Sequence, residues 1–454
     1  MSLLSHQATE PSPAAAEQVP AQLRHRPGID RMIAEWDTTP GKLRVTMVVL
    51  VLGILLSGGV GVYAAEVRAQ TTRDIAERIE PLNAHVTTLY RSLAAADATV
   101  TSGFLSGSLE PAGVRARYDD HVAAATAKLA QAGAQAGEDR VTVDRIADIA
   151  AQLPVYTGLV ERARANNRQG LPLGVAYLRR SSELMQSSIL PKAEELQGRQ
   201  ATRLDDAYRQ AESVPVFALM AGTVSLAGLI WAQLFLFRRT HRVFNIGLVA
   251  ATATVLVGLL WWTVTGVISA GHLQSSKGDS KSVSRALGPA QIAALQARAT
   301  ESLGLVARNG GATENAFTGQ MQLLARSDGA GGALGAARRF ATDQRGADLV
   351  KMAVSEARDY RKAHQEVRRL DAAGKYHQAV GAALLADPAT GRTTFERLDA
   401  ALTLAVEHER RTFGDAITRA RSWLIGLNVG TGVLAMTAAI GVIVGVRGRL
   451  EEYR

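Results

Sequence analysis

Four apolar stretches interrupt a chain whose other segments alternate apolar and polar residues. They cover residues 45–65, 214–237, 243–268 and 423–446, and none of them contains Asp, Glu, Lys or Arg. Each stretch is long enough to cross a hydrocarbon core ~30 Å thick as a helix of about 20 residues. The pattern therefore predicts four transmembrane helices, with the second and third joined by a tight hairpin at residues 238–242.

The first stretch has two interpretations. A cleaved signal peptide would fit the small residues near Ala64 and the polar sequence that follows. However, residues 1–44 precede the stretch, far more than an ordinary signal peptide places there. A retained anchor is the better prediction, and Gly58, Gly59 and Gly61 would let another helix approach it closely.

Three sets of basic residues flank the predicted spans, and in a four-span topology all three lie on the same side of the membrane. The three flanking sets are Arg24, Arg26, Arg31, Lys42 and Arg44; Arg238, Arg239 and Arg242; and Arg447, Arg449 and Arg454. The positive-inside rule places these flanks in the cytoplasm. We therefore expect a multi-pass protein of the cell membrane with cytoplasmic termini, a largely disordered segment 1–44 and a short tail 447–454. The loops 66–213 and 269–422 would then be extracytoplasmic.

The first long loop carries apolar residues at alternating spacings of three and four. One such seam runs from Ile75 to Val100, a second from Val114 to Ala132 and a third from Ile146 to Ala163. A period of 3.5 residues is typical of helices packed in a left-handed bundle. With a fourth helix from about Leu173, the loop predicts a four-helix bundle, with kinks expected at Pro81 and Pro191.

The second long loop repeats this plan. Its seams are Ile292, Leu295, Ala299 and Val306; Leu349, Met352, Glu356, Tyr360, Ala363, Val367 and Leu370; and Phe395, Leu398, Leu402, Val406, Phe413 and Ile417. Glycines between residues 309 and 335 make its second helix the least defined. Tyr156 and Tyr360 hold matching places, so the sequence predicts an all-α chain built from a duplicated span–bundle–span unit.

Composition restricts the chemistry. The chain has no cysteine, and its histidines are scattered without metal-ligand spacing, so no metal, cofactor or catalytic site is predicted. Its net charge of +9 forms no contiguous patch, which argues against nucleic acid as a partner. We therefore expect a protein that is not an enzyme and whose surroundings include membrane lipid.

Four charged residues are candidates for ligand or partner contact: Arg91, Asp97, Arg298 and Glu301. Asp97 stands among alanines, and Arg298 and Glu301 are spaced i,i+3. The alternative interpretation is that they occupy exposed helix positions, with Arg298 and Glu301 forming a local ion pair.

Several short motifs resemble a family of actinobacterial four-span sensor proteins. They include Leu89-Tyr90-Arg91-Ser92-Leu93, Asp97-Ala98-Thr99, Leu190-Pro191-Lys192-Ala193 and the set Arg298, Glu301, Leu305, Ala307 and Arg308. The resemblance extends to the membrane component encoded beside a glutamine- or glutamate-binding lipoprotein and a soluble serine/threonine kinase. The bundles also resemble the ligand-binding domains of chemoreceptors.

This resemblance implies a signal relay. A solute-binding lipoprotein would report amino-acid availability outside, and the protein would pass it to a cytoplasmic serine/threonine kinase. The short cytoplasmic segments support the same expectation, because none of them is long enough for an output domain. A homodimer suits bundles of this kind. An envelope scaffold and a transporter or channel subunit remain alternatives.

Overall fold

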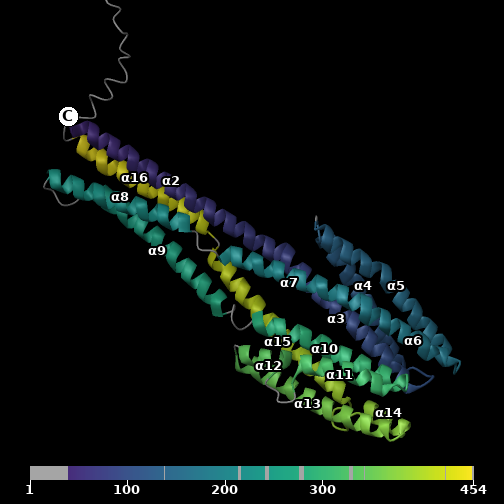
Figure 1. Cartoon of the computed structure of the whole chain (residues 1–454). Helices are drawn as coiled ribbons and strands as arrows, with labels where there is room; N and C mark the ends of the chain where they lie inside the picture. The colour runs from purple at the N-terminus through teal and green to yellow at the C-terminus, as the bar shows by residue number, and fades with distance from the viewer. Residues whose placement is uncertain are drawn as a thin grey trace, which may run out of the picture. The chain divides into compact units, whose positions relative to one another are not determined.

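The computed structural model of the protein describes residues 39–137, 139–212, 216–240, 245–275, 281–326, 331–341, 343–424 and 426–451. All regular elements in these ranges are helices, apart from one isolated bridge between Ala386 and Thr393. The predicted all-α class is thus confirmed. The chain forms two compact units (Figure 1). One contains most of the apolar segments, and the other spans residues 60–219 and 258–432.

Four helices supply the apolar unit. They are α2 (Thr39–Asp74), α8 (Val216–Thr240), α9 (Ile246–Ser275) and α16 (Leu427–Glu451). Each contains a window long and apolar enough to cross a membrane, as the sequence predicts. The predicted fourth span begins four residues before α16, because Gly426 adopts a φ of 91° and separates α15 from α16. Residues 1–38, 241–244 and 452–454, which hold parts of the predicted cytoplasmic segments, lie outside the described residues.

Small residues bring the helices of this unit into close contact. A Cβ atom on Gly247 of α9 would overlap the backbone of Gly441 and Gly445 on α16. Gly58 of α2 likewise faces Ala435, whereas Gly59 faces open space. The prediction of close approach therefore holds at Gly58 and at Gly61, where a Cβ atom would lie 2.9 Å from Thr431 Cγ2, and is wrong at Gly59.

The second unit begins with the first bundle. Its elements are η1 (Ile75–Ile79), α3 (Glu80–Gly103), η2 (Phe104–Ser106), α4 (Ala112–Gln135), α5 (Arg140–Arg168), α6 (Leu173–Leu184), η3 (Met185–Ile189) and α7 (Leu190–Glu212). The six seam residues of α5, from Ile146 to Ala163, are all buried. The fourth helix of the bundle is α6, η3 and α7 in continuous succession.

The expected distortions at Pro81 and Pro191 take a specific form. A π-helical turn precedes each proline, η1 before Pro81 and η3 before Pro191. Proline cannot donate a backbone hydrogen bond, and its ring clashes with the carbonyl four residues earlier. The wider π-helical turn accommodates both the missing hydrogen bond and the proline ring.

The second bundle contains α10 (Lys281–Val306), α11 (Gly310–Leu324), α12 (Gly332–Phe340), α13 (Gln344–Ala372), α14 (Tyr376–Leu384) and α15 (Thr394–Leu424). Its second helix is divided into α11 and α12, and Gly332, the first residue of α12, has a φ of 73°. The glycine-rich composition had made this helix the least defined. The short helix α14 was not predicted.

The two bundles share a core along α3 and α10, which lie side by side (Figure 1). Ile292, Leu295 and Ala299 pack into the core of the first bundle rather than their own. The opposite face of α10 packs into the second bundle through Leu287 and through small residues such as Ala290 and Ala294. The predicted seam of α10 was therefore assigned to the wrong partner, because this helix is buried on two faces.

The seam predicted for α13 is also partly wrong. Met352 is 47% exposed, whereas Val350, Ala353 and Ala357 are buried. A straight α-helix drifts away from a strict 3.5-residue repeat. The predicted seam and the observed buried face of α13 coincide again at Tyr360 and Val367, which are both buried.

Candidate functional site: a buried carboxylate in each bundle

Asp97 of α3 lies inside the first bundle and is only 1% exposed. Its Oδ2 atom accepts hydrogen bonds from Ser182 Oγ at 2.8 Å and from Gln186 Nε2 at 3.3 Å. Ser182 belongs to α6, and Gln186 lies within the π-helical turn η3. The turn before Pro191 thus carries one of the two side chains that bind the buried carboxylate.

The Tyr156 hydroxyl of α5 lies beside Asp97 and acts on its carboxylate as a third, neutral hydrogen-bond donor. Burial raises the pKa of Asp97 to about 6, against the hydrogen bonds from Ser182, Gln186 and Tyr156, which favour the ionised form. Asp97 is consequently ionised at pH 7 in an almost fully buried position.

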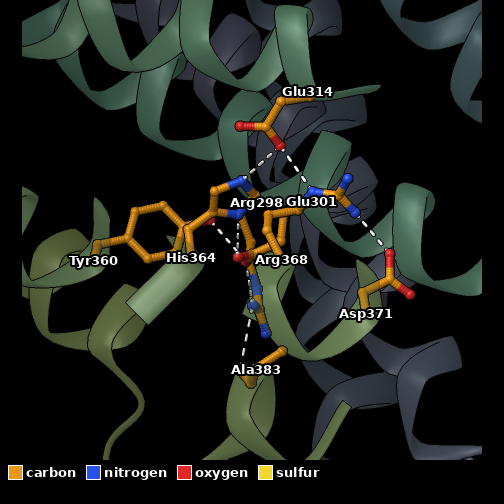
Figure 2. A network of polar contacts seen from close by, with 8 residues as sticks. All are labelled: Arg298, Glu301, Glu314, Tyr360, His364, Arg368, Asp371 and Ala383. Carbon is orange, nitrogen blue, oxygen red and sulfur yellow. Dashed lines mark hydrogen bonds and ion pairs between the residues drawn. The ribbon is translucent and has the colours of Figure 1, made fainter. Parts of the chain in front are cut away.

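The second bundle places a larger network around Glu301 of α10 (Figure 2). Glu301 Oε2 accepts from Arg298 Nη1 at 2.9 Å and from the Tyr360 hydroxyl at 2.9 Å, while Oε1 lies 2.8 Å from His364 Nδ1. Arg298 also donates to the Ala383 carbonyl of α14, at 3.4 Å. Both oxygens of Glu301 are therefore satisfied within the chain.

His364 extends this network towards the surface. Its Nε2 atom lies 3.2 Å from Glu314 of α11, which also pairs with Arg368 at 3.0 Å. The ring of His364 stacks on Phe317 with centroids 3.4 Å apart. A doubly protonated ring would donate one hydrogen bond to each carboxylate.

Partner charges determine the ionisation of Glu301. Burial alone would raise its pKa, but the hydrogen bond from His364 and the charge of Arg298 outweigh burial and hold the pKa below its ordinary value. Glu301 is therefore a compensated buried carboxylate, whereas Asp97 interacts only with neutral groups.

A constant spacing relates the two sites. The pairs Asp97 and Glu301, Glu110 and Glu314, Asp139 and Asp343, Tyr156 and Tyr360, and Arg164 and Arg368 are each 204 residues apart. Asp139 and Asp343 cap the N-termini of α5 and α13 in the same way, through side-chain bonds to backbone N–H groups. The carboxylate–tyrosine pair is therefore a duplicated feature of the fold.

The structure separates the predicted site residues into three places. Arg298 and Glu301 form the predicted i,i+3 ion pair, but as buried rather than exposed residues. Asp97 lies in the core of the first bundle. Arg91 faces the second bundle, where its Nη2 atom donates to Thr403 Oγ1 of α15 at 3.1 Å.

Residues 71–209 match the family model of the actinobacterial sensor domain. The matched region is the first bundle, and the match supports an actinobacterial sensor family and a role in sensing or signalling. Together with the four apolar helices, it indicates a multi-pass membrane protein that carries a sensor domain. No curated protein and no solved structure matches the chain.

Three members of the network around Glu301 are not among the residues predicted from the sequence: His364, Glu314 and Arg368. His364 was grouped with the scattered histidines because its carboxylate partners lie 63 and 50 residues away. The constant spacing of 204 residues would have located Glu314 and Arg368 from their counterparts in the first bundle. His364 has no such counterpart, since Val160 occupies the matching position.

Proposed function

We propose that this protein is a transmembrane relay that passes extracytoplasmic nutrient status to a cytoplasmic partner. The observation that carries this proposal is the sensor-domain match over residues 71–209, in a chain with four candidate membrane spans. Consecutive helical elements run without an intervening loop from Arg44 to Ser106. The first span therefore continues into α3, the helix that carries Asp97.

The sequence supports a topology and a set of partners for this relay. Basic flanks favour cytoplasmic termini and extracytoplasmic bundles. The motifs shared with the four-span sensor family favour a solute-binding lipoprotein as the outer partner and a serine/threonine kinase as the inner one. Glutamate, aspartate or glutamine would be the reported nutrient. In this proposal the protein itself performs no catalysis.

A small movement of packed helices would carry the signal. Because α3 and α10 share one core, a change in either bundle alters the packing of the other. Arg91 and Gln291 both donate hydrogen bonds to Thr403 Oγ1, and a change in packing between the bundles would alter these two bonds.

Transport is the weaker candidate. Polar side chains in the apolar unit are engaged in helix contacts: Gln233 with Thr252 at 2.7 Å, Asn245 with the Gly445 carbonyl at 2.7 Å, and Ser225 with Ser57 at 3.0 Å. The predicted spans contain no Asp, Glu, Lys or Arg, the residues that usually mark a transport pathway.

The test compares cells with and without the gene. Phosphorylation of the kinase substrates should respond to added glutamate or aspartate in the wild type and lose that response after deletion, with recovery on complementation. An unchanged response after deletion would contradict the relay and favour a scaffold. Stimulus-dependent flux in vesicles containing the purified protein would instead favour transport.

A further inference from the structure

Two loops lie side by side at the end of the first bundle where α3 and η2 end. One loop joins η2 to α4, and the other joins α5 to α6 (Figure 1). Asn167 Nδ2 donates to the Gly107 carbonyl at 2.8 Å, and the Arg164 guanidinium pairs with Glu110 at 2.9 Å. These two contacts hold the loops together, so the residues beside them belong to one surface.

This surface exposes three leucines. Leu109 is 82% exposed, Leu173 is 56% exposed and Leu171 is 42% exposed. Exposed leucines that occur singly are common on proteins, whereas several of them gathered on adjoining loops mark a place where another molecule binds. Together these three residues form the leucine surface.

The second bundle offers a direct comparison for the turn between α5 and α6. Gly170 in this turn has a φ of 70°, and Gly374, 204 residues later, has a φ of 72°. In both turns the N–H group of the residue after the glycine donates to the carbonyl five residues before it. The two turns therefore have the same backbone conformation.

The side chains on these matching loops differ in polarity. The residues 204 positions after the three leucines are all polar: Thr313, Lys375 and His377. Lys375 and His377 are exposed, as are the leucines that they match. Because the same turn folds with lysine and histidine, folding does not require leucine there. The leucine surface is therefore better explained by contact with another molecule.

Two exposed arginines accompany the leucine surface. Arg168 lies in the last turn of α5. Arg117 lies on α4, and a Cβ atom added to Gly113 in the first turn of that helix would be 3.9 Å from its Nη1 atom. Among the described residues neither arginine has an ion pair. The matching residues of the second bundle are Ala372 and Met321, so these two charges have no counterpart there.

We propose that the leucine surface and these two arginines bind an extracytoplasmic protein whose own surface is apolar at its centre and carries carboxylates at its rim. Interfaces usually combine an apolar core with a polar rim, and an arginine can bind a carboxylate through two hydrogen bonds. This inference rests on the proposed function, because it assigns the surface to the outer partner of the relay, the solute-binding lipoprotein. A second copy of the chain fits less well, since two arginine-bearing surfaces repel each other.

Binding at this surface would act on the helix that leads into the membrane. The loop of Leu109 follows directly after the helical run from Arg44 to Ser106, which includes the first span. The turn of Leu171 precedes α6, which carries Ser182, a hydrogen-bond donor to Asp97. A partner that contacts both loops would therefore move α3 and α6 relative to each other, and Asp97 connects these two helices.

The test measures binding of the lipoprotein, purified without its lipid anchor, to the full chain in detergent micelles by biolayer interferometry. Leu171→Lys/Leu173→His introduces the residues of the second bundle and should weaken binding about tenfold or more, because residues at the centre of an interface dominate its affinity. The matched control is Leu323→Lys. Leu323 is an exposed leucine of α11 in the second bundle, and its replacement should leave the affinity unchanged.

The charge of the surface is tested separately. Arg117→Ala/Arg168→Ala should weaken binding several-fold at about 50 mM salt and much less at about 500 mM, because salt screens the attraction to carboxylates. In living cells, a photoreactive amino acid in place of Leu171 should cross-link to the same lipoprotein. The same amino acid in place of Leu323 should not.

Equal affinity of the wild type and Leu171→Lys/Leu173→His, or no binding of the lipoprotein to the wild type, would overturn the proposal. Cross-links from position 171 to a second copy of the chain or to lipid, instead of the lipoprotein, would overturn it equally. The relay is judged by a different measurement, the loss of the phosphorylation response after gene deletion. Binding that depends on the leucine surface would support this docking site even if that response were unchanged.

Discussion

Replacing Glu301 with glutamine should destabilise the second bundle strongly. The wild-type carboxylate accepts from Arg298, Tyr360 and His364 with both oxygens. Glutamine has nearly the same shape but only one oxygen, and its NH₂ group must face a donor. The change therefore removes a charge and a hydrogen-bond acceptor while leaving the packing almost unaltered.

The size of the destabilisation depends on the groups that are left around Arg298 after the substitution. This guanidinium is 5% exposed, and its other acceptor is the Ala383 carbonyl, a long contact of 3.4 Å. Removing one partner of a buried ion pair costs about 3–5 kcal/mol, because an uncompensated charge stays inside. We expect the free energy of unfolding to fall by about this amount at pH 7.

The variant should also change the response to pH. The pKa of Glu301 is lower in the folded state than its ordinary value, so the carboxylate stabilises the fold above that ordinary value. This contribution is lost as the pH falls through the lower folded-state pKa. Glu301→Gln should lack that acid-dependent loss.

Urea unfolding of the detergent-solubilised chain, followed by circular dichroism, measures the effect through the shift in midpoint. Glu366→Gln removes one partner of an exposed ion pair with Arg369 and should leave the midpoint unchanged. The double variant Arg298→Met/Glu301→Leu should recover much of the loss, since it removes both charges. A midpoint for Glu301→Gln equal to that of Glu366→Gln, or no recovery in the double variant, would refute the reasoning.

Three further predictions concern other parts of the chain. Asp97→Asn should be more stable than the wild type by up to about 3 kcal/mol above pH 6, since the raised folded-state pKa of Asp97 makes its ionisation unfavourable, and should lose this advantage towards pH 4. A difference in urea midpoints that does not vary with pH would contradict this. Gly247→Val should lower the unfolding temperature by several degrees through backbone overlap, whereas Gly59→Ala, in open space, should not. A double-mutant cycle of Arg91→Met and Thr403→Val should give a coupling energy of about 0.5–1.5 kcal/mol, and strict additivity would exclude a direct contact.

The sequence determined the helical class, the spans and the duplication, because these depend on regular patterns along the chain. Long runs without charge identify membrane helices, and the repeat of apolar residues every three or four positions identifies bundle helices. The correspondence between Tyr156 and Tyr360 is also visible in the sequence, because α5 and α13, the helices that carry them, have the same length of 29 residues.

Only the tertiary structure decided which faces meet. The apolar residues of α10 are equally compatible with either bundle as a partner, and the structure places Ile292 and Leu295 against the first one. Asp97 and Glu301 look alike in sequence as carboxylates on the first helix of a bundle. Their ionic environments differ because partners from distant helices, such as His364 of α13, reach one of them and not the other. Periodicity specifies which side of a helix is apolar, but the groups that surround a buried charge depend on how separate helices pack.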